Sequence, residues 1–291
     1  MKILVTGGSG YLGSHIREYF GGEDPFPPPR LALLPPPHRH GVPGLDLGVH
    51  LPAFPDKTPE PADEVFLTNV EGTINLLRVM RSDTVFIFAS TKDVYGRFAD
   101  NYPEVPEDCP TLYSGQTALE WSKLIAERYV EYYSHRTRFR SCIFRLSNVY
   151  APASEGNSPG LVGHYAEMVA KGDPVALPAG GRPRRDLLHV DDLAAACERF
   201  IDSVLRYGIY NLGGGRQNAL TLRELVDTLG RITGKEPVID DSVTVPDPVP
   251  MNYVSDIRRV RQELDWEPQI GVEEGLATLF DAPDAEGADA A

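Results

Sequence analysis

The sequence predicts an α/β protein built around a doubly wound parallel sheet, and three observations support this fold class. The chain opens with a continuous apolar run, residues 3–5, of the kind that forms a short buried strand. A glycine-rich turn and a segment with helical spacing follow it directly. Further along, strand-like apolar runs alternate with helix-like segments, which is the rhythm of βαβ units. With 291 residues, 42% of them hydrophobic, the chain can bury a sizeable core.

The glycine-rich turn has the spacing of a dinucleotide-binding motif. In such a turn the first glycine permits the tight bend, the second lets the backbone approach a pyrophosphate, and the third lets the helix pack against the strand. Backbone amides at the start of the helix then point at the phosphates, where the helix dipole is positive. The turn therefore predicts a Rossmann-type dinucleotide site, with an ordinary glycine-rich turn as the alternative. The predicted cofactor contacts here are Gly7, Gly10, Tyr11, Leu12 and Gly13.

Composition narrows the class of protein. The net charge is −14, which argues against nucleic-acid binding, because that binding depends on lysine and arginine. No apolar run approaches the roughly 20 residues of a membrane helix, and we expect a cytoplasmic protein without a membrane partner. The cysteines Cys109, Cys142 and Cys197 are far apart, and the histidines lack metal-ligand spacing. We therefore expect reduced cysteines and no metal site.

A proline-rich segment interrupts the first half of the predicted sheet. Residues 21–61 hold many of the 26 prolines, and proline removes backbone donors and breaks helices. Only the runs 30–34 and 45–51 have the composition of short strands. The stretch is too short for the further strands and crossovers of a complete dinucleotide-binding half. We therefore predict a truncated N-terminal half that is compressed at residues 21–61.

The βα rhythm returns after this segment. Apolar residues have helical spacing over 69–77 and 119–133, while 84–89 and 141–146 are continuous strand-like runs. Thr91 follows one of these strands, at the edge where open α/β sheets bind ligands. The predicted division is a dinucleotide-binding domain at 1–150, a mostly substrate-binding region at 151–280 and a disordered, acidic tail at 281–291.

Several motifs, in a fixed order, resemble those of a known family. They are the T-G-x-x-G-x-x-G turn from Thr6, residues 50–53 (HLPA), 94–96 (VYG), 184–193 (RRDLLHVDDL), 210–213 (YNLG) and 260–268 (VRQELDWEP). On these motifs the chain resembles the extended short-chain dehydrogenase/reductases, the NAD-dependent epimerase/dehydratase-like family. Its best-known members are nucleotide-sugar epimerases and dehydratases. The resemblance implies a nicotinamide cofactor and hydride transfer.

The family's catalytic residues are only partly present. Its Ser/Thr position falls on Thr91, whose hydroxyl would donate to a substrate carbonyl, and its helix lysine falls on Lys123, which would contact the nicotinamide ribose. The family tyrosine would lie on the same helix face as the lysine, but Leu119 stands in its place. Since leucine has no proton to give, the resemblance implies Thr91 and Lys123 as catalytic residues without the usual acid. The alternatives are a structural threonine and an exposed helix lysine.

Other polar residues could line the substrate pocket. Tyr95 and Tyr113 are candidate replacements for the missing acid, although a buried tyrosine more often bonds a local partner. Ser147 and Asn148 match a substrate-side position of the family. The predicted substrate-binding residues are Tyr95, Tyr113, Ser147 and Asn148, with His164 and Arg185 as further lining residues.

The loop after the candidate second strand bears on the choice of cofactor. An NAD site usually offers an acidic side chain to the ribose 2′-hydroxyl, whereas arginine suits the 2′-phosphate of NADP. Here the chain has Arg39 between two histidines and no acidic residue. We therefore predict NADP(H), with Arg39 as a cofactor contact. Solvated loop charge is the alternative.

The absence of the family tyrosine allows three interpretations of the function. The protein could be a relative that binds the cofactor without catalysis, another protein group could transfer the proton, or the substrate could supply its own proton. Three features, namely Leu119, the proline-rich segment and the basic loop, make the chain resemble atypical ketoreductases of angucyclinone biosynthesis. We therefore predict an NAD(P)H-dependent ketoreductase that reduces a carbonyl of an aromatic polyketide (angucyclinone) in antibiotic biosynthesis. A phenol beside that carbonyl would be the internal acid. The alternatives are a nucleotide-sugar epimerase or reductase and a catalytically inactive NADP-binding regulator. We expect a monomer or homodimer.

Overall fold

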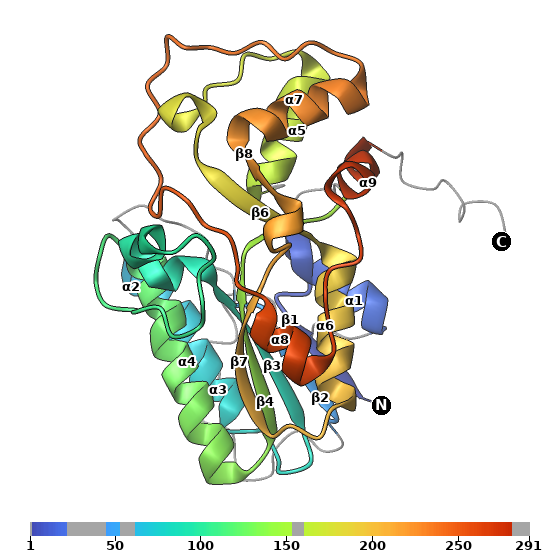
Figure 1. The fold of residues 1–291 in the computed structure, drawn as a ribbon. Coiled ribbons are helices and arrows are strands. Elements are labelled where there is room, and N and C mark those ends of the chain that lie inside the picture. The colour runs from blue at the N-terminus through green and yellow to red at the C-terminus, as the bar shows by residue number, and fades with distance from the viewer. Residues whose placement is uncertain (1, 22–44, 53–61, 153–159, 281–291) are drawn as a thin grey trace, which may run out of the picture.

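The computed structural model describes residues 2–21, 45–52, 62–152 and 160–280 (Figure 1). Within these residues the main sheet has five strands, all parallel, in the order β1-β2-β3-β4-β7. The strands are β1 (Ile3–Thr6), β2 (Leu47–His50), β3 (Val85–Thr91), β4 (Arg140–Leu146) and β7 (Tyr207–Leu212). The predicted fold class, a Rossmann-type α/β protein, is therefore confirmed.

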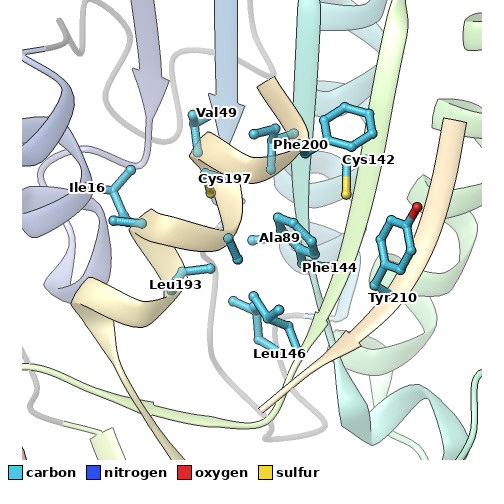
Figure 2. Packing of buried hydrophobic residues seen from close by; sticks show 14 of the residues in the cluster. Ile16, Val49, Ala89, Cys142, Phe144, Leu146, Leu193, Cys197, Phe200 and Tyr210 are labelled. Atoms are coloured by element: carbon cyan, nitrogen blue, oxygen red, sulfur yellow. The ribbon is translucent and has the colours of Figure 1, made fainter. Parts of the chain in front are cut away.

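Helices cover both faces of the main sheet, because its strands are apolar on both sides. In β3, Ile87 packs in the cluster with α1, α6 and α8, whereas Phe86 and Phe88 pack in the cluster with α3 and α4. These helices are α1 (Tyr11–Phe20), α3 (Gly72–Leu77), α4 (Ala118–Thr137), α6 (Val190–Asp202) and α8 (Arg258–Leu264). Figure 2 labels part of the first cluster: Ile16, Leu193, Cys197 and Phe200 from helices, and Val49, Ala89, Cys142, Phe144, Leu146 and Tyr210 from strands.

A smaller sheet lies beyond the carboxyl end of β4. It has the order β5-β6-β8, with β5 (Asn148–Tyr150), β6 (Arg184–His189) and β8 (Ala219–Thr221). Its core contains residues of α5 (Gly160–Lys171), α7 (Leu222–Thr233) and α9 (Val272–Ala277). The remaining helical segments are α2 (Ala62–Phe66), the π-helix η1 (Leu67–Glu71), and the 3-10 segments η2 (Lys92–Asn101), η3 (Pro178–Gly181), η4 (Arg216–Asn218) and η5 (Thr278–Phe280).

Most elements expected from the sequence are present, with shifted ends. The helix expected directly after the glycine-rich turn begins at Tyr11, and the helix expected at 69–77 is divided into η1 and α3. β2 pairs with β1 on one side and β3 on the other, so the run at 45–51 does form a strand. β7 belongs to the main sheet although it lies beyond residue 150, so the division proposed at that residue stays a prediction. The run 30–34 and the tail 281–291 lie outside the described residues.

No helix in the described ranges is long and apolar enough to cross a membrane.

Helix α4 carries Lys123 and is held at its start by a capping box. The side chain of Glu120 accepts hydrogen bonds from the backbone N–H (2.6 Å) and the hydroxyl (2.5 Å) of Thr117. This reciprocal pairing satisfies amides that have no partner inside the helix. The first turn of α4, which contains Leu119, is therefore fixed before the helix reaches the sheet.

A buried ion pair holds the same helix against the sheet. Arg145 of β4 donates to the Glu127 carboxylate from Nε (3.0 Å) and Nη2 (2.7 Å), and the two side chains are 4% and 0% exposed. Ser90 of β3 donates to the same carboxylate. Arg145 also donates to the Tyr95 hydroxyl, which donates in turn to Asn211 of β7. One polar network therefore joins α4 to three strands.

We expect Glu127→Ala to lower the free energy of unfolding by about 3–5 kcal/mol, because it leaves the Arg145 charge buried without its partner. Glu131→Ala is the matched control on the same helix: its partner is the exposed Arg128, so its cost should stay below about 1 kcal/mol. Urea unfolding measures both values. Equal losses for the two variants would show that the buried network does not anchor α4.

Candidate active site

The turn after β1 has the geometry of an anion-binding turn. Gly7 has φ of 77°, and a Cβ there would lie 2.3 Å from the backbone oxygen of Leu51. A Cβ at Gly13 would lie 1.8 Å from the backbone oxygen of Gly7, so strand and helix approach each other as only glycine permits. Gly10 is the N-cap of α1 and offers no side-chain cap to the first amides of the helix. The turn therefore fits a pyrophosphate.

Lys123 lies at the carboxyl edge of the sheet and is 8% exposed. Its Nζ donates to the backbone oxygens of Pro52 (2.7 Å) and Ala89 (2.8 Å), and it lies 5.6 Å from the centre of the Phe88 ring. Burial lowers the pKa of this amine from 10.5 to about 7, and the nearby Glu127 charge opposes that shift. Lys123 is therefore not the exposed helix lysine of the alternative interpretation.

Thr91 and Leu119 are the other two positions of the family's catalytic set. Thr91 ends β3, is partly exposed and accepts a hydrogen bond from the backbone N–H of Asp93 (3.2 Å). Its hydroxyl proton stays available for a ligand oxygen, since an acceptor role leaves the O–H free. Leu119 lies one helical turn before Lys123 and is partly exposed. The predicted catalytic pair is thus at the sheet edge, and the position of the family tyrosine is aliphatic.

A buried hydrogen-bond chain, which sequence reasoning missed, lies behind Lys123. Thr73 donates to the backbone oxygen of Asn69 (2.5 Å), so it accepts from Nε2 of His50 (2.8 Å). Nδ1 of His50 then accepts from Thr6 (2.5 Å). Asn69 also donates to Ser122, the neighbour of Lys123 (2.9 Å). The sequence signal for this chain of hydrogen bonds is His50, which belongs to the HLPA motif of the family resemblance.

His50 is neutral because its environment disfavours a second proton. Burial lowers its pKa from 6.5 to about 3, and the charge of Lys123 lowers it further. The hydrogen bonds with Thr6 and Thr73 already occupy both ring nitrogens. The chain therefore adds no positive charge beside the Lys123 amine.

The two predicted tyrosines lie in different surroundings. Tyr95 is 0% exposed, and its hydroxyl is bonded to Asn211 (2.6 Å) and Arg145 (2.9 Å). The side chain therefore belongs to the buried network that joins α4 to the sheet, and its substrate contact stays a prediction. Tyr113 is 71% exposed and stacks on Trp121, 6.5 Å between ring centres. It lies before α4 and outside the hydrogen-bond chain of Lys123.

Ser147 and Asn148 lie where the main sheet passes into the smaller one. Ser147 donates to the Asp186 carboxylate and to its backbone oxygen (2.9 Å), so its hydroxyl is already committed. Oδ1 of Asn148 is buried and accepts no hydrogen bond within the described structure. Arg185 donates to the backbone oxygens of Met251 (2.8 Å) and Pro250 (2.9 Å). Asn148 is therefore the residue of this group that is best suited to receive a ligand hydroxyl.

Other predicted residues lie apart from this edge or outside the described ranges. His164 is an exposed residue of α5, and its ring contacts Tyr165. Arg39 lies outside the described residues, so the structure does not place the predicted 2′-phosphate contact. A surface hollow of about 480 Å³ lies elsewhere, lined by Ala195, Arg199, Arg261, Asp265, Trp266, Glu267 and Gln269. Over the described residues, no group of three or more His, Cys, Asp or Glu side chains is arranged to hold a metal ion.

A pyrophosphate-type turn, a strand-end threonine and a buried lysine on one sheet edge define a Rossmann-type, dinucleotide-binding class of protein. The chain belongs to the NAD dependent epimerase/dehydratase family, whose sequence pattern matches residues 41–213. The family comprises NAD(P)-dependent enzymes of the oxidoreductase and epimerase type. The predicted family is therefore confirmed.

Several individual relatives are distant in sequence. The chain is 27% identical over 246 residues to CDP-paratose 2-epimerase of Salmonella typhi, covering 74% of this chain and 70% of the relative. It is 26% identical over 307 residues to GDP-6-deoxy-D-mannose reductase of Pseudomonas aeruginosa, covering 96% of each. The structure of Thermus thermophilus UDP-glucose 4-epimerase in complex with NAD superposes with a TM-score of 0.72 at 27% identity, covering 96% of this chain and 97% of that one. UDP-glucose 4-epimerase of Thermotoga maritima shares the fold, with a TM-score of 0.78 at 24% identity and the same coverage.

The names of these relatives bear on the class of substrate. Their names refer to nucleotide sugars, which supports the alternative prediction of a nucleotide-sugar epimerase or reductase better than the predicted polyketide ketoreductase. The resemblance to angucyclinone ketoreductases is not shown by these comparisons. The structure of Thermus thermophilus UDP-glucose 4-epimerase is a complex with NAD, and that of RMD from Pseudomonas aeruginosa is a complex with NADPH. These structures therefore do not decide between the two cofactors.

We expect Gly13→Ala to weaken dinucleotide binding by more than about tenfold, or about 1.4 kcal/mol, because the added Cβ must push α1 away from Gly7. Gly271→Ala, at a site where a Cβ meets nothing within 4 Å, is the matched control and should bind normally. Isothermal titration with NAD⁺ and NADP⁺ measures both variants. Unchanged binding by Gly13→Ala would place the dinucleotide elsewhere.

Proposed function

We propose that this protein is an NAD(P)-dependent enzyme that acts by hydride transfer at a sugar carbon of a nucleotide sugar, as a reductase or an epimerase. The names of the relatives support the substrate class. The observation that carries the proposal is the enclosed Lys123 amine, which donates to the backbone oxygen of Ala89, two residues before Thr91. It also donates to the backbone oxygen of Pro52, which follows the Leu51 that the glycine turn approaches. A protein that only binds a dinucleotide has no need of an amine with a pKa of about 7 at this edge.

The division of labour follows from the side chains. When bound, the dinucleotide would supply or accept the hydride. Thr91 donates a hydrogen bond from its hydroxyl to the oxygen of the reacting carbon and holds that oxygen at the sheet edge. Lys123, in its ammonium form, is the acid for reduction and delivers a proton to that oxygen through a bridging water. Its neutral amine is the base for the reverse direction. Leu119 takes no part except to exclude solvent.

We further propose NADP(H) as the preferred cofactor. The support is Arg39, which stands between two histidines in a stretch without acidic residues. Arg39→Ala should weaken NADPH binding by about tenfold, on the order of one charge-assisted contact, and leave NADH binding unchanged. Titration calorimetry with each cofactor measures this. NADH binding as tight as NADPH binding in the wild type would contradict the preference.

Leu119 favours a second candidate function, reduction of an aromatic polyketide ketone. A phenol next to the ketone would supply the proton that the protein does not deliver through a tyrosine, and an internal donor can lower the barrier by about 7 kcal/mol. In this case Lys123 would only orient the cofactor. The two candidates therefore differ in the role of one amine.

A substrate panel separates the candidates. Purified protein with NADPH or NADH is offered 4-keto nucleotide sugars, and with NAD⁺ it is offered UDP-glucose and UDP-glucuronate. Quinonoid polyketide ketones form the third arm. Turnover of a nucleotide sugar supports the main proposal, whereas turnover of polyketides alone supports the second. Dinucleotide binding without any turnover would identify an inactive, NADP-binding regulator and overturn both.

We expect kcat/KM for reduction to be constant below about pH 7 and to fall tenfold per unit above it. The pKa of Lys123 is about 7, so the ammonium acid is lost as the pH rises through that value. The reverse oxidation should rise over the same interval. A profile without a break between pH 6 and 9 would remove Lys123 as the acid.

Two substitutions test the same assignment. Lys123→Met should lower kcat by about 10²–10⁴, the usual contribution of general acid catalysis. Tyr113→Phe should change kcat by less than about twofold, because that ring is exposed and stacks on Trp121. A fully active Lys123→Met variant together with an inactive Tyr113→Phe variant would assign the proton to the tyrosine.

A further inference from the structure

Tyr11 makes an unusual contact across the molecule. It is the first residue of α1, directly after the N-cap Gly10. Its hydroxyl donates to the backbone oxygen of Ala151 (2.6 Å) and accepts from the backbone N–H of the same residue (2.8 Å). Because the hydroxyl uses both its donor and an acceptor position on one residue, it fixes Ala151 in position and orientation.

The contact is reinforced by neighbouring groups. Nε2 of His15, one turn further along α1, lies 3.2 Å from the backbone oxygen of Pro152, and the two rings of Tyr11 and His15 meet edge to face. A Cβ added to Gly160, the first residue of α5, would lie 3.7 Å from the Tyr11 ring. The start of α1 therefore contacts the chain just after β5 and lies close to the start of α5.

The two ends of this contact belong to different candidate ligand sites. The backbone amides of Tyr11 and its neighbours form the anion-binding end of α1. Ala151 lies three residues after Asn148, whose buried Oδ1 accepts no bond within the described structure. β5, which contains Asn148, pairs with β6 in the smaller sheet. A shift of Ala151 would thus move the strand that carries Asn148.

We propose that Tyr11 is a positioning residue that couples the dinucleotide site to the substrate site. This inference rests on the proposed function, because it takes the ligand at Asn148 to be the nucleotide sugar. A dinucleotide bound at the start of α1 orders that turn. Through the Tyr11 hydroxyl, the same event orders Ala151 and the strand before it. The substrate therefore binds more tightly after the cofactor, and by linkage the cofactor binds more tightly after the substrate.

A purely structural hydroxyl predicts something different. It would lower overall stability, or both binary affinities, without changing how one ligand affects the other. Coupling, in contrast, is the ratio of substrate dissociation constants without and with the dinucleotide. That ratio is the quantity to measure.

The test compares Tyr11→Phe with Tyr19→Phe. Tyr19 lies on the same helix, and its hydroxyl also donates one hydrogen bond, 3.0 Å to Glu198, but on the exposed surface. Titration calorimetry measures the binding of UDP, CDP, GDP and dTDP, each with and without saturating NADP⁺ or NAD⁺. In the wild type and in Tyr19→Phe we expect the dinucleotide to tighten binding of the preferred diphosphate by about tenfold, within the usual range of coupling. In Tyr11→Phe the ratio should fall to about one.

The outcomes separate the coupling from the proposed function. Equal ratios in the wild type and Tyr11→Phe, or a loss of coupling in Tyr19→Phe as well, would overturn the coupling alone. A wild-type protein that binds a dinucleotide but none of the diphosphates would overturn the nucleotide-sugar class, and the coupling with it. If Tyr11→Phe loses binary dinucleotide affinity as much as it loses coupling, the hydroxyl only supports the turn and the proposal is wrong.

Discussion

The ion pair between Arg145 and Glu127 fixes helix α4, and with it Lys123, at the carboxyl edge of the main sheet. It is sealed between α4 and the sheet, with both side chains almost without solvent contact. Charges are costly to bury unless each has its partner, so the pair leaves α4 only one favourable position. Lys123 precedes Glu127 by one turn and is thereby held over the ends of β2 and β3. The packing of α4 against the sheet and the position of Lys123 are therefore consequences of the same ion pair.

Among the described residues with shifted pKa values at this edge, the Lys123 amine is the group whose pKa lies near neutrality. His50 is neutral and saturated by two threonines, and Tyr95 is enclosed in the network of Arg145. Leu119 adds no polar atom. The amine itself donates to two backbone oxygens, which accept hydrogen bonds without carrying a full charge. Burial therefore lowers the pKa of Lys123 more than the Glu127 charge raises it.

Local signals in the sequence were sufficient for the frame of this structure. The apolar run before Gly7, the glycine spacing and the strand before Thr91 depend on neighbouring residues, and they predicted the turn and the sheet edge correctly. The role of Tyr95 could not be predicted, because its hydroxyl is bonded to Asn211, which is 116 residues away. The burial of Lys123 likewise depends on Pro52, which lies in a different part of the chain. Contacts between residues that are far apart in the sequence leave no local pattern, so they could not be predicted from the sequence.

The most direct measurement is the pKa of the Lys123 amine itself. Protein labelled with ¹⁵N in its lysine side chains can be titrated by NMR from pH 5 to 11, and the spectrum of Lys123→Met assigns the resonance. We expect the Lys123 amine to titrate near 7. A Lys123 amine that titrates near 10.4, the ordinary value of a lysine, would mean that it stays a fixed cation at neutral pH, and the proton would then have to come from the substrate or from another group.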